Sequence, residues 1–470
     1  MSILKHTLAY HHDSVRLFER VAHEPWAMLL DSGQMIEPST GEPGSEYGQY
    51  DILVAKPIAT LVTTGEHTKI REGGDEQFSK EDPFVLLNKL LSRYKAPAVD
   101  VPFAGGAMGY FSYDLGRRLE TINDKNPAED IPEMMVGIYD WAVIVDHRKQ
   151  CSFLISHGLS VKTQEAWDDL CRLFDAPYVP IETSFVVNSA VEANFSKAEY
   201  QKAFDQVKAY IKSGDCYQVN LAQRFHADVE GDGWAAYKKL REISPAPFMA
   251  YMQLPHNAEE CFQVLSNSPE RFVQVVGDYV ETRPIKGTRP RSDDATEDLA
   301  YATALQNSAK DQAENLMIVD LLRNDIGKNC EIGSVTVEKL FQLQSFANVH
   351  HLVSIISAKL HQHSTVIDLL KGCFPGGSIT GAPKVRAMQI IEELEPNRRG
   401  IYCGAVGYIS FDGKMDTNIA IRTAVVSKKQ LSYYAGGGIV ADSNGPNEYL
   451  ETLDKASTMV KLLKFFKRRD

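Results

Sequence analysis

Short runs of alternating or wholly apolar residues dominate the chain from about Phe18 to Asp146. Runs such as residues 50–54 and 141–145 are separated by polar loops, which is typical of strands bounded by turns. The periodicity weakens around residues 183–193, and Ser196 followed by Glu199 then predicts the capped start of a helix that ends near Gly214. We therefore expect a sheet-rich amino-terminal region, residues 1–190, and a second region, residues 191–470.

The second region mixes predicted helices with many predicted strands. Several of these strands follow one another without an intervening helix, which favours antiparallel pairing over a doubly wound parallel sheet. The sequence therefore predicts an α+β fold, with large antiparallel sheets in a two-lobed sandwich flanked by helices. The predicted strands are residues 218–222, 271–276, 279–282, 349–356, 404–410, 419–426 and 431–436.

Composition narrows the class of protein. The 470 residues are 44% hydrophobic, which is enough for a substantial core, and the net charge of -12 argues against a nucleic-acid surface. The seven cysteines are widely spread and never in a Cys-x-x-Cys spacing, which suits reduced thiols. No apolar run approaches the roughly 20 residues that a membrane span needs. We expect a soluble cytoplasmic protein with no nucleic-acid or membrane partner.

One lysine stands out in the basic run of residues 283–290. Lys286 lies between an extended Pro-Ile segment and a Gly-Thr turn, near other cations. A lysine that is shielded from water near other positive charges loses its proton more readily, so its neutral amine can attack carbon near pH 7. A hydrated loop lysine explains the same pattern, and the surroundings must decide between the two.

Two predicted helices each carry a pair of acidic residues. Asp311 and Glu314 share one helix face, and Glu448 and Glu451 share another, with Lys455 one turn further. Carboxylates spaced in this way suit a hard divalent cation such as Mg²⁺. The alternative is a pair of hydrated helix faces with local salt bridges.

Two glycine-rich segments offer main-chain donors to an anion. Residues 373–388 run from a Gly-rich turn into a helix with Pro383 in its first turn, and residues 435–442 follow a strand. Arg422 lies in an apolar, strand-like setting and would need an anionic partner. These features suggest a small substrate with more than one carboxylate. His350 and His351 point to opposite faces of a predicted strand, so only one of them can face a site.

Together these motifs resemble the chorismate-utilising enzymes, and the resemblance covers nearly the whole chain. The resemblance implies the fold of that family. It is strongest to the branch that aminates chorismate at C4 for the synthesis of 4-aminobenzoate and folate. The alternatives are the anthranilate synthase reaction, which aminates C2, and a tryptophan-binding scaffold without catalysis. Besides the motifs above, the blocks that carry the resemblance are residues 24–33, 50–55, 215–221 and 268–272.

The resemblance also implies roles for individual residues. Glu314 and Glu451 would bind Mg²⁺, with Asp311 and Glu448 completing the acidic shell through water and Lys455 close by. Relatives that make anthranilate usually carry Glu at position 311 and Thr at position 378, so this chain departs from them at both positions. The residues that would contact chorismate are Tyr402, Arg422, Gly437, Gly438, His351 and Ser378.

Lys286 separates the branches of this family. The related anthranilate, isochorismate and salicylate synthases typically have Ala at its position, and the latter two have a lysine base where this chain has Gln218. The resemblance implies that Lys286 attacks ring C2 while Glu270 protonates the departing C4 hydroxyl. Ammonia would then add at C4 and displace the lysine, giving 4-amino-4-deoxychorismate.

Two further partners follow from the resemblance. The sequence has no Gly-x-Cys-x-Gly nucleophile loop, so ammonia is expected from a separate glutamine amidotransferase subunit in a heterodimer. Some relatives bind tryptophan in the amino-terminal half, and Ser32, Pro247 and Phe248 match that region loosely. Ordinary core packing is the alternative for these three residues.

Overall fold

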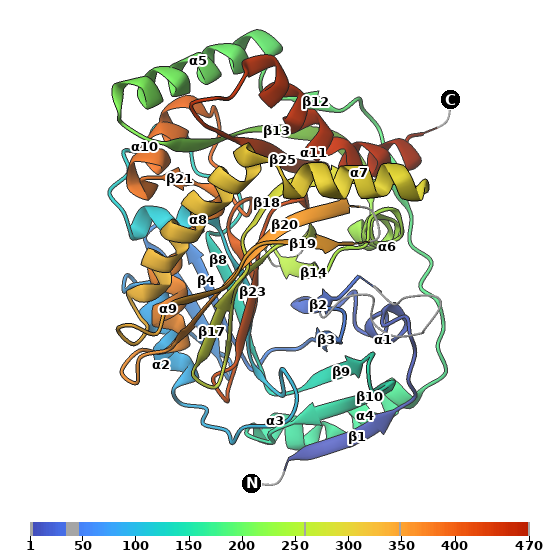
Figure 1. Ribbon diagram of the computed structural model, residues 1–470. Helices are drawn as coiled ribbons and strands as arrows, with labels where there is room; N and C mark the ends of the chain where they lie inside the picture. Colours follow the sequence, from blue (N-terminus) through green and yellow to red (C-terminus); the bar gives the residue numbers. More distant parts are fainter. Residues whose placement is uncertain (1–2, 34–46, 258–259, 347–348, 469–470) are drawn as a thin grey trace.

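Two large antiparallel sheets lie face to face, and helices cover their outer faces (Figure 1). The computed structural model describes residues 3–33, 47–257, 260–346 and 349–468. In the first sheet the strands follow in the order β1 (Leu4–Leu8), β10 (Cys151–Ser156), β9 (Ala142–Asp146), β3 (Tyr50–Val54), β2 (Ala27–Asp31), β14 (Phe248–Pro255), β15 (Cys261–Ser268), β24 (Thr423–Ser427), β25 (Gln430–Ile439), β13 (Gln218–Gly231) and β11 (Phe185–Val187), with β12 (Glu192–Ala193) and β21 (Gly381–Ala382) also paired to β13.

The second sheet provides β18, the strand that carries Lys286. Its order is β18 (Ile285–Pro290), β20 (Val349–Lys359), β17 (Tyr279–Thr282), β16 (Arg271–Val276), β23 (Met415–Ile419), β22 (Ala405–Ser410), β7 (Gly106–Phe111), β8 (Met134–Tyr139), β4 (Ala59–Thr64), β5 (His67–Glu72) and β6 (Asp75–Ser79), with β19 (Thr336–Ser345) paired to β20.

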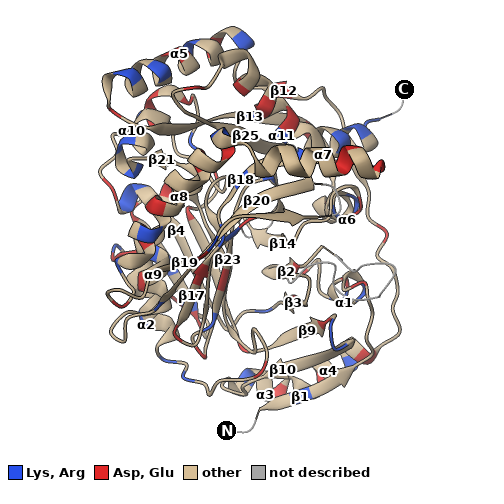
Figure 2. Ribbon diagram, viewed as in Figure 1, with Lys and Arg blue, Asp and Glu red and all other residues tan. Residues whose placement is uncertain are grey.

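Helices lie around both sheets. They are α1 (Val15–Phe18), α2 (Pro83–Leu91), α3 (Val161–Glu165), α4 (Trp167–Asp175), α5 (Lys197–Ser213), α6 (Gly233–Ile243), α7 (Ala295–Gln306), α8 (Ala309–Gly327), α9 (Val366–Cys373), α10 (Lys384–Leu394) and α11 (Gly445–Phe465), with 3₁₀ helices η1 (Tyr113–Arg118) and η2 (Gly377–Ile379). None of the described helices is long and apolar enough to cross a membrane. Acidic and basic residues are interspersed over the molecule (Figure 2).

Alternation along the strands divides the core into layers. On β2 and β9, Met28 and Ile144 belong to the cluster between the sheets, whereas Leu29 and Val143 belong to the cluster under the outer helices. Successive side chains of a strand point to opposite faces, so one short strand can serve both layers. This explains why strands near the amino terminus are continuous apolar runs.

Both sheets contain strands from either side of residue 190. Strand β2 pairs with β14, and β7 pairs with β22, so each sheet joins the amino-terminal region to the second region. The boundary at residue 190 therefore stays a prediction about order along the chain. The antiparallel α+β architecture predicted from the sequence is confirmed.

Local signals located several elements of the second region, but the strands β14, β15, β18 and β19 lie outside the predicted ranges. Helix α5 begins after Ser196 with a capping box to Glu199 and ends at Gly214, whose φ is 83°. The predicted strand 419–426 is wrong: β23 ends at Ile419 in the second sheet and β24 begins at Thr423 in the first. Arg422 lies at this crossing with φ 52°, a left-handed conformation that interrupts a strand.

Candidate active site

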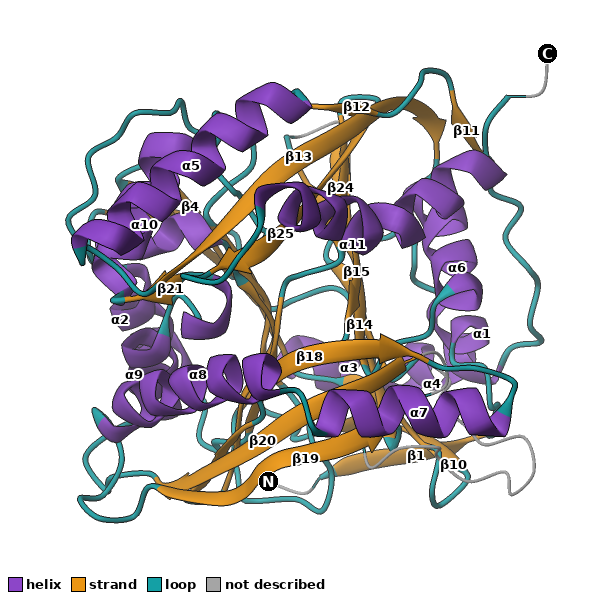
Figure 3. Ribbon diagram, turned by 45° about the horizontal axis from the view of Figure 1, so that its top comes forward, coloured by secondary structure: helices purple, strands orange, loops and turns teal. Residues whose placement is uncertain are grey.

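Lys286 lies where β18 departs from regular pairing. The register against β20 shifts between Ile285 and Thr288, and Gly287 in this irregular segment has φ 81°. The partly buried Lys286 donates from Nζ to the carbonyl oxygen of Ser378 at 3.3 Å. Helix α8 lies alongside β18, and α11 lies alongside β25 (Figure 3). Glu314 of α8 and Lys455 and Glu451 of α11 all act electrostatically on Lys286, so both helices with acidic pairs lie near this lysine.

The electrostatic surroundings favour the neutral amine of Lys286. Burial lowers the pKa of Lys286, and the charge of Lys455 lowers it further, while Glu314 and Glu270 act in the opposite direction. Desolvation penalises the charged form of an amine, and a neighbouring cation adds to that penalty. This is the environment that the basic sequence around Lys286 suggested, although the neighbouring cation is Lys455 from α11.

Glu270 occupies the turn between β15 and β16, and its charge interacts with that of Lys286. Its side chain is buried, and the hydroxyl of Ser378 donates to its Oε1 at 3.1 Å. Burial raises the pKa of Glu270 to about 7, and Lys286 and Ser378 limit that rise. A carboxyl group with this pKa is partly protonated at neutral pH and can donate a proton.

The acidic residues of α8 have different partners. Asp311 accepts from Arg289 Nη2 at 3.1 Å and lies over Gly287, where an added Cβ would come 2.9 Å from its Cγ. Burial raises the pKa of Glu314, the charges of Lys286 and Lys310 oppose that rise, and those of Asp311 and Glu448 add to it. The charge of Glu448 on α11 therefore acts on the carboxylate of Glu314 on α8.

The acidic pair of α11 converges on the glycine segment of β25. A Cβ added to Gly437 would lie 3.1 Å from Glu448 Oε2 and 3.4 Å from Glu451 Oε1. Lys455 Nζ lies 2.7 Å from Glu451 Oε1 and donates to the carbonyl oxygen of Gly436 at 3.0 Å. Burial opposes ionisation of Glu451, but Lys455, together with Lys286 and Lys310, outweighs it, so the pKa of Glu451 is lowered.

These carboxylates fit a hard divalent cation by their chemistry. Within the described residues, no three or more His, Cys, Asp or Glu side chains form a ready metal-binding group. The donors are nevertheless all oxygen atoms, Glu448 is buried, and its charge raises the pKa of Glu314 across the two helices. Mg²⁺ needs only one or two carboxylates besides water and substrate oxygens, so the carboxylates of α8 and α11 are enough to hold one ion.

Arg422 and Tyr402 are neighbours in a second part of the candidate site, and the charge of Arg422 also acts on His351. Among the described residues, the Arg422 side chain has no salt bridge and no hydrogen-bond partner, although burial lowers its pKa. A shielded guanidinium without an acidic partner is suited to an incoming anion. Tyr402 is the group whose charge affects Arg422, and its ring stacks on Tyr434 at 5.2 Å.

The two neighbouring histidines face different surroundings. His351 is buried and lies 3.0 Å from the hydroxyl of Thr288 through Nδ1. Burial and the nearby charge of Arg422 lower the pKa of His351 to about 4, so the ring is neutral at physiological pH. His350 instead bonds Asp298 and Ser345, away from this group. His351 is the histidine that can contact a ligand here.

Gln218 lies on β13 behind the glycine segment. Its side chain is fully buried, and neither amide atom has a partner in the described part of the chain. An added Cβ on Gly438 would lie 2.7 Å from its Nε2, so the amide is close to the main chain of β25. A neutral amide at this position cannot act as a base toward water.

A separate cavity lies between the two sheets. Its volume is about 330 Å³, and Ser32, Pro247 and Phe248 all line it, as does the charged side chain of Lys414. The backbone N–H and the hydroxyl of Ser32 both donate to buried Asp51 at 2.7 Å, which fixes this wall. The structure therefore brings the three residues of the predicted tryptophan region around one cavity.

Sequence reasoning missed the buried residues behind the site. Arg399 is 2% exposed and links the segment of Ser378 to β13. Its neighbour Arg398 gives the same signal in the sequence, and no pattern distinguishes the buried arginine from the other. Asn220 lies among residues 215–221, where its residue type alone indicates no role.

Comparisons with known proteins show the family of this chain. The model of the chorismate binding enzyme family matches residues 43–461, and the chain belongs to that family. It is 48% identical to aminodeoxychorismate synthase component 1 of Salmonella typhimurium (strain LT2), over 94% of each chain. It is 47% identical to the component 1 protein of the same name from Escherichia coli (strain K12), over 97% of this chain and 98% of the relative.

A solved structure confirms the fold. Anthranilate synthase component I from Streptococcus pneumoniae TIGR4 superposes with a TM-score of 0.75 at 32% identity, covering 88% of this chain and 93% of that one. The family and the fold class expected from the sequence are therefore confirmed, as is the resemblance to the C4-aminating branch.

Proposed function

We propose that this chain aminates chorismate at C4 with ammonia, giving 4-amino-4-deoxychorismate for 4-aminobenzoate and folate synthesis. The observation that carries the proposal is the shielded amine of Lys286, whose pKa burial and Lys455 depress, in a site with the protonatable Glu270. The names of the relatives, aminodeoxychorismate synthase component 1, support the same reaction.

The two carboxylates of chorismate suit the two ends of this site. Arg422 lacks an acidic partner among the described residues and would bind the enolpyruvyl carboxylate together with Tyr402 and the main chain of Gly437 and Gly438. His351 and Ser378 would line the ring pocket, with the histidine as a neutral contact.

The proposed chemistry has two displacements at the ring. The neutral amine of Lys286 attacks C2, the ring double bond shifts, and the C4 hydroxyl leaves as water after taking a proton from Glu270. Ammonia then attacks C4, the double bond shifts back, and Lys286 leaves C2 as the neutral amine. The ammonium group formed at C4 returns a proton to Glu270. The net change replaces the hydroxyl group with an amino group and releases one water. Neutral Gln218 provides no base to activate water as a competing nucleophile.

Glu314 and Glu451 would hold Mg²⁺, with Asp311 and Glu448 in the surrounding acidic shell. When bound, Mg²⁺ supplies Lewis-acid withdrawal of electrons through the ring carboxylate. Lys455, fixed by Glu451 and the carbonyl of Gly436, adds a positive charge beside the same carboxylate.

The proposal also includes a partner subunit and a second small-molecule ligand. The ammonia source would be a separate glutamine amidotransferase subunit, and the designation component 1 of the relatives supports a multi-subunit enzyme. The cavity between the sheets would bind tryptophan, since its size suits a bicyclic amino acid and its wall carries both apolar and charged side chains.

The test is the identity of the product. Purified protein with chorismate, Mg²⁺ and ammonium ions is expected to form 4-amino-4-deoxychorismate and little anthranilate, as separated by chromatography. Anthranilate as the main product would establish the alternative, an anthranilate synthase. Failure to consume chorismate with ammonia and metal present would favour a tryptophan-binding scaffold.

A further inference from the structure

Arg399 lies behind the candidate site, and among the described residues it forms no hydrogen bond or ion pair with Lys286 or Arg422. Its guanidinium donates to both carboxylate oxygens of Glu395, from Nε at 2.9 Å and from Nη2 at 2.6 Å. It also donates from Nη1 to the carbonyl of Ile379 at 3.1 Å and from Nη2 to the carbonyl of Asn220 at 2.6 Å. One buried cation therefore joins η2, β13 and the end of α10.

The first of these carbonyls belongs to the segment that holds Lys286 and Glu270. Ile379 follows Ser378, whose carbonyl oxygen accepts from Lys286 and whose hydroxyl donates to Glu270. A displacement of the Ile379 carbonyl would move the backbone of Ser378 with it, because the two residues are joined by a planar peptide bond. The positions of both proposed catalytic groups thus depend on this segment.

The second carbonyl belongs to Asn220, a neighbour of Tyr402: burial raises the pKa of the Tyr402 hydroxyl, and the nearby Asn220 side chain opposes that rise. The guanidinium of Arg399 itself lies 5.6 Å from the centre of the Tyr402 ring. Tyr113 lies on the guanidinium as well, with 4.8 Å to its ring centre. Arg399 is therefore enclosed by aromatic rings and by hydrogen-bond acceptors.

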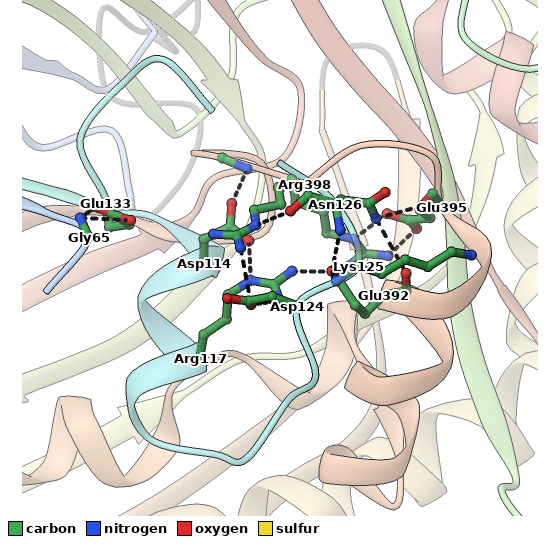
Figure 4. A network of polar contacts seen from close by, with 12 residues as sticks. Gly65, Asp114, Arg117, Asp124, Lys125, Asn126, Glu133, Glu392, Glu395 and Arg398 are labelled. Carbon is green, nitrogen blue, oxygen red and sulfur yellow. Dashed lines mark hydrogen bonds and ion pairs between the residues drawn. The ribbon is translucent and has the colours of Figure 1, made fainter. Parts of the chain in front are cut away.

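Glu395, the acidic partner of Arg399, belongs to a polar network with Asn126, Glu392 and Arg398 (Figure 4). Glu395 also accepts from the backbone N–H of Ala222 at 2.9 Å, and its carbonyl accepts from Asn126 Nδ2 at 2.8 Å. The backbone N–H of Gly400 donates to Asp114 Oδ2 at 2.8 Å. Residues of the amino-terminal region thus fix both sides of the Arg399 position.

We propose that Arg399 is a positioning residue that holds Ser378 and Tyr402 in their working geometry for the proposed amination. This inference rests on the proposed function. A planar guanidinium can satisfy a carboxylate and two carbonyl groups at fixed angles, which a lysine ammonium at the same place cannot do. Misplacing a reacting group by about 1 Å can cost on the order of 100-fold in rate.

The test compares Arg399→Met and Arg399→Lys with Arg117→Met. Arg117 is a matched control, since it bonds Asp114 and Glu392 in the same network but donates to neither Ile379 nor Asn220.

Both Arg399 variants are expected to lose roughly tenfold or more in kcat, with Arg399→Lys the milder. They should also shift the alkaline limb of the pH profile of kcat to higher pH, because Glu270 loses the Ser378 hydrogen bond that favours its ionised form. Arg117→Met should lower Tm without moving that limb.

An unchanged alkaline limb in both Arg399 variants, with loss of Tm alone, would overturn the inference and leave Arg399 a purely structural residue. If Arg399→Met does not fold, Arg399→Lys against Arg117→Met decides in the same way. The limb is measured with whichever aminated product the wild-type protein forms. Anthranilate as that product would contradict the proposed function while still testing the role of Arg399.

Discussion

Glu270 is the residue whose protonation state the proposed reaction requires. Its pKa of about 7 places the acid form below neutral pH and the carboxylate above it. The rate of C4 amination is therefore expected to fall as pH rises through about 7, when free ammonia is held constant. Glu270→Gln should lose roughly 100-fold or more in kcat and remove this limb. A wild-type limb retained in Glu270→Gln would assign the titration to another group.

The same residue is expected to lower the stability of the folded protein. The pKa of Glu270 is higher in the folded protein than its ordinary value of 4.5, so folding favours the protonated carboxyl group. The stability that this preference contributes is lost as pH rises from 4.5 through about 7. At pH 8 the difference in pKa corresponds to a loss of roughly 3 kcal/mol in the free energy of unfolding. Glu270→Gln should therefore stabilise the protein more at pH 8 than at pH 4.5, as measured by urea unfolding. Equal effects at the two pH values would contradict this.

Short motifs marked candidate residues without deciding their chemistry. The basic run around Lys286 and the paired carboxylates on α8 and α11 fit reactive groups by residue type and spacing, and they equally fit hydrated surfaces. Their partners were not predictable, because Arg289 pairs with Asp311 and Lys455 pairs with Glu451 only after strands and helices from distant positions meet. Arg399 looked the same as Arg398, since burial is a property of the fold.

At the scale of elements, capping and turn residues predicted helix boundaries better than apolar runs predicted strands. Ser196, Glu199 and Gly214 bound α5 as their local chemistry requires. The run 419–426 is apolar throughout most of its length, yet the chain crosses from one sheet to the other at Arg422. An apolar run cannot show which sheet each half joins, because both halves are buried.

The irregular β18 segment gives a prediction about Gly287. Its φ is 81°, and an added Cβ would lie 2.7 Å from Leu305 and 2.9 Å from Asp311. Gly333 has the same φ of 81° with open space around it and serves as the matched control. Gly333→Ala should cost about 1 kcal/mol, whereas Gly287→Ala should cost at least about 2 kcal/mol more and reduce amination. Tm and kcat measure both effects, and equal losses would show that Asp311 does not lie against this turn.

At the scale of the whole molecule, the amino-terminal region is part of both sheets. The sequence predicted antiparallel sheets but could not reveal that β2 pairs with β14 or that β7 pairs with β22, since such pairings join residues far apart in the chain. The cavity that Ser32 and Phe248 line exists because of this shared construction. A ligand there would stabilise both sheets together.

The cavity between the two sheets predicts that bound tryptophan stabilises the protein. A ligand present at 100 times its dissociation constant adds about 2.7 kcal/mol to the free energy of unfolding, which should raise Tm by several degrees. Thermal unfolding with and without L-tryptophan measures this, and Phe248→Ala should weaken the response. Absence of any shift at millimolar tryptophan, together with no heat of binding in calorimetry, would leave core packing as the role of this region.

The central claim is that Lys286 directs amination to C4. The most direct measurement compares wild-type protein and Lys286→Ala at equal chorismate, Mg²⁺ and ammonia, with both ring products quantified by chromatography. Lys286→Ala is expected to lose roughly 100-fold or more of the C4 product, or to form the C2 product instead. Formation of 4-amino-4-deoxychorismate at the wild-type rate by Lys286→Ala would contradict the proposed mechanism.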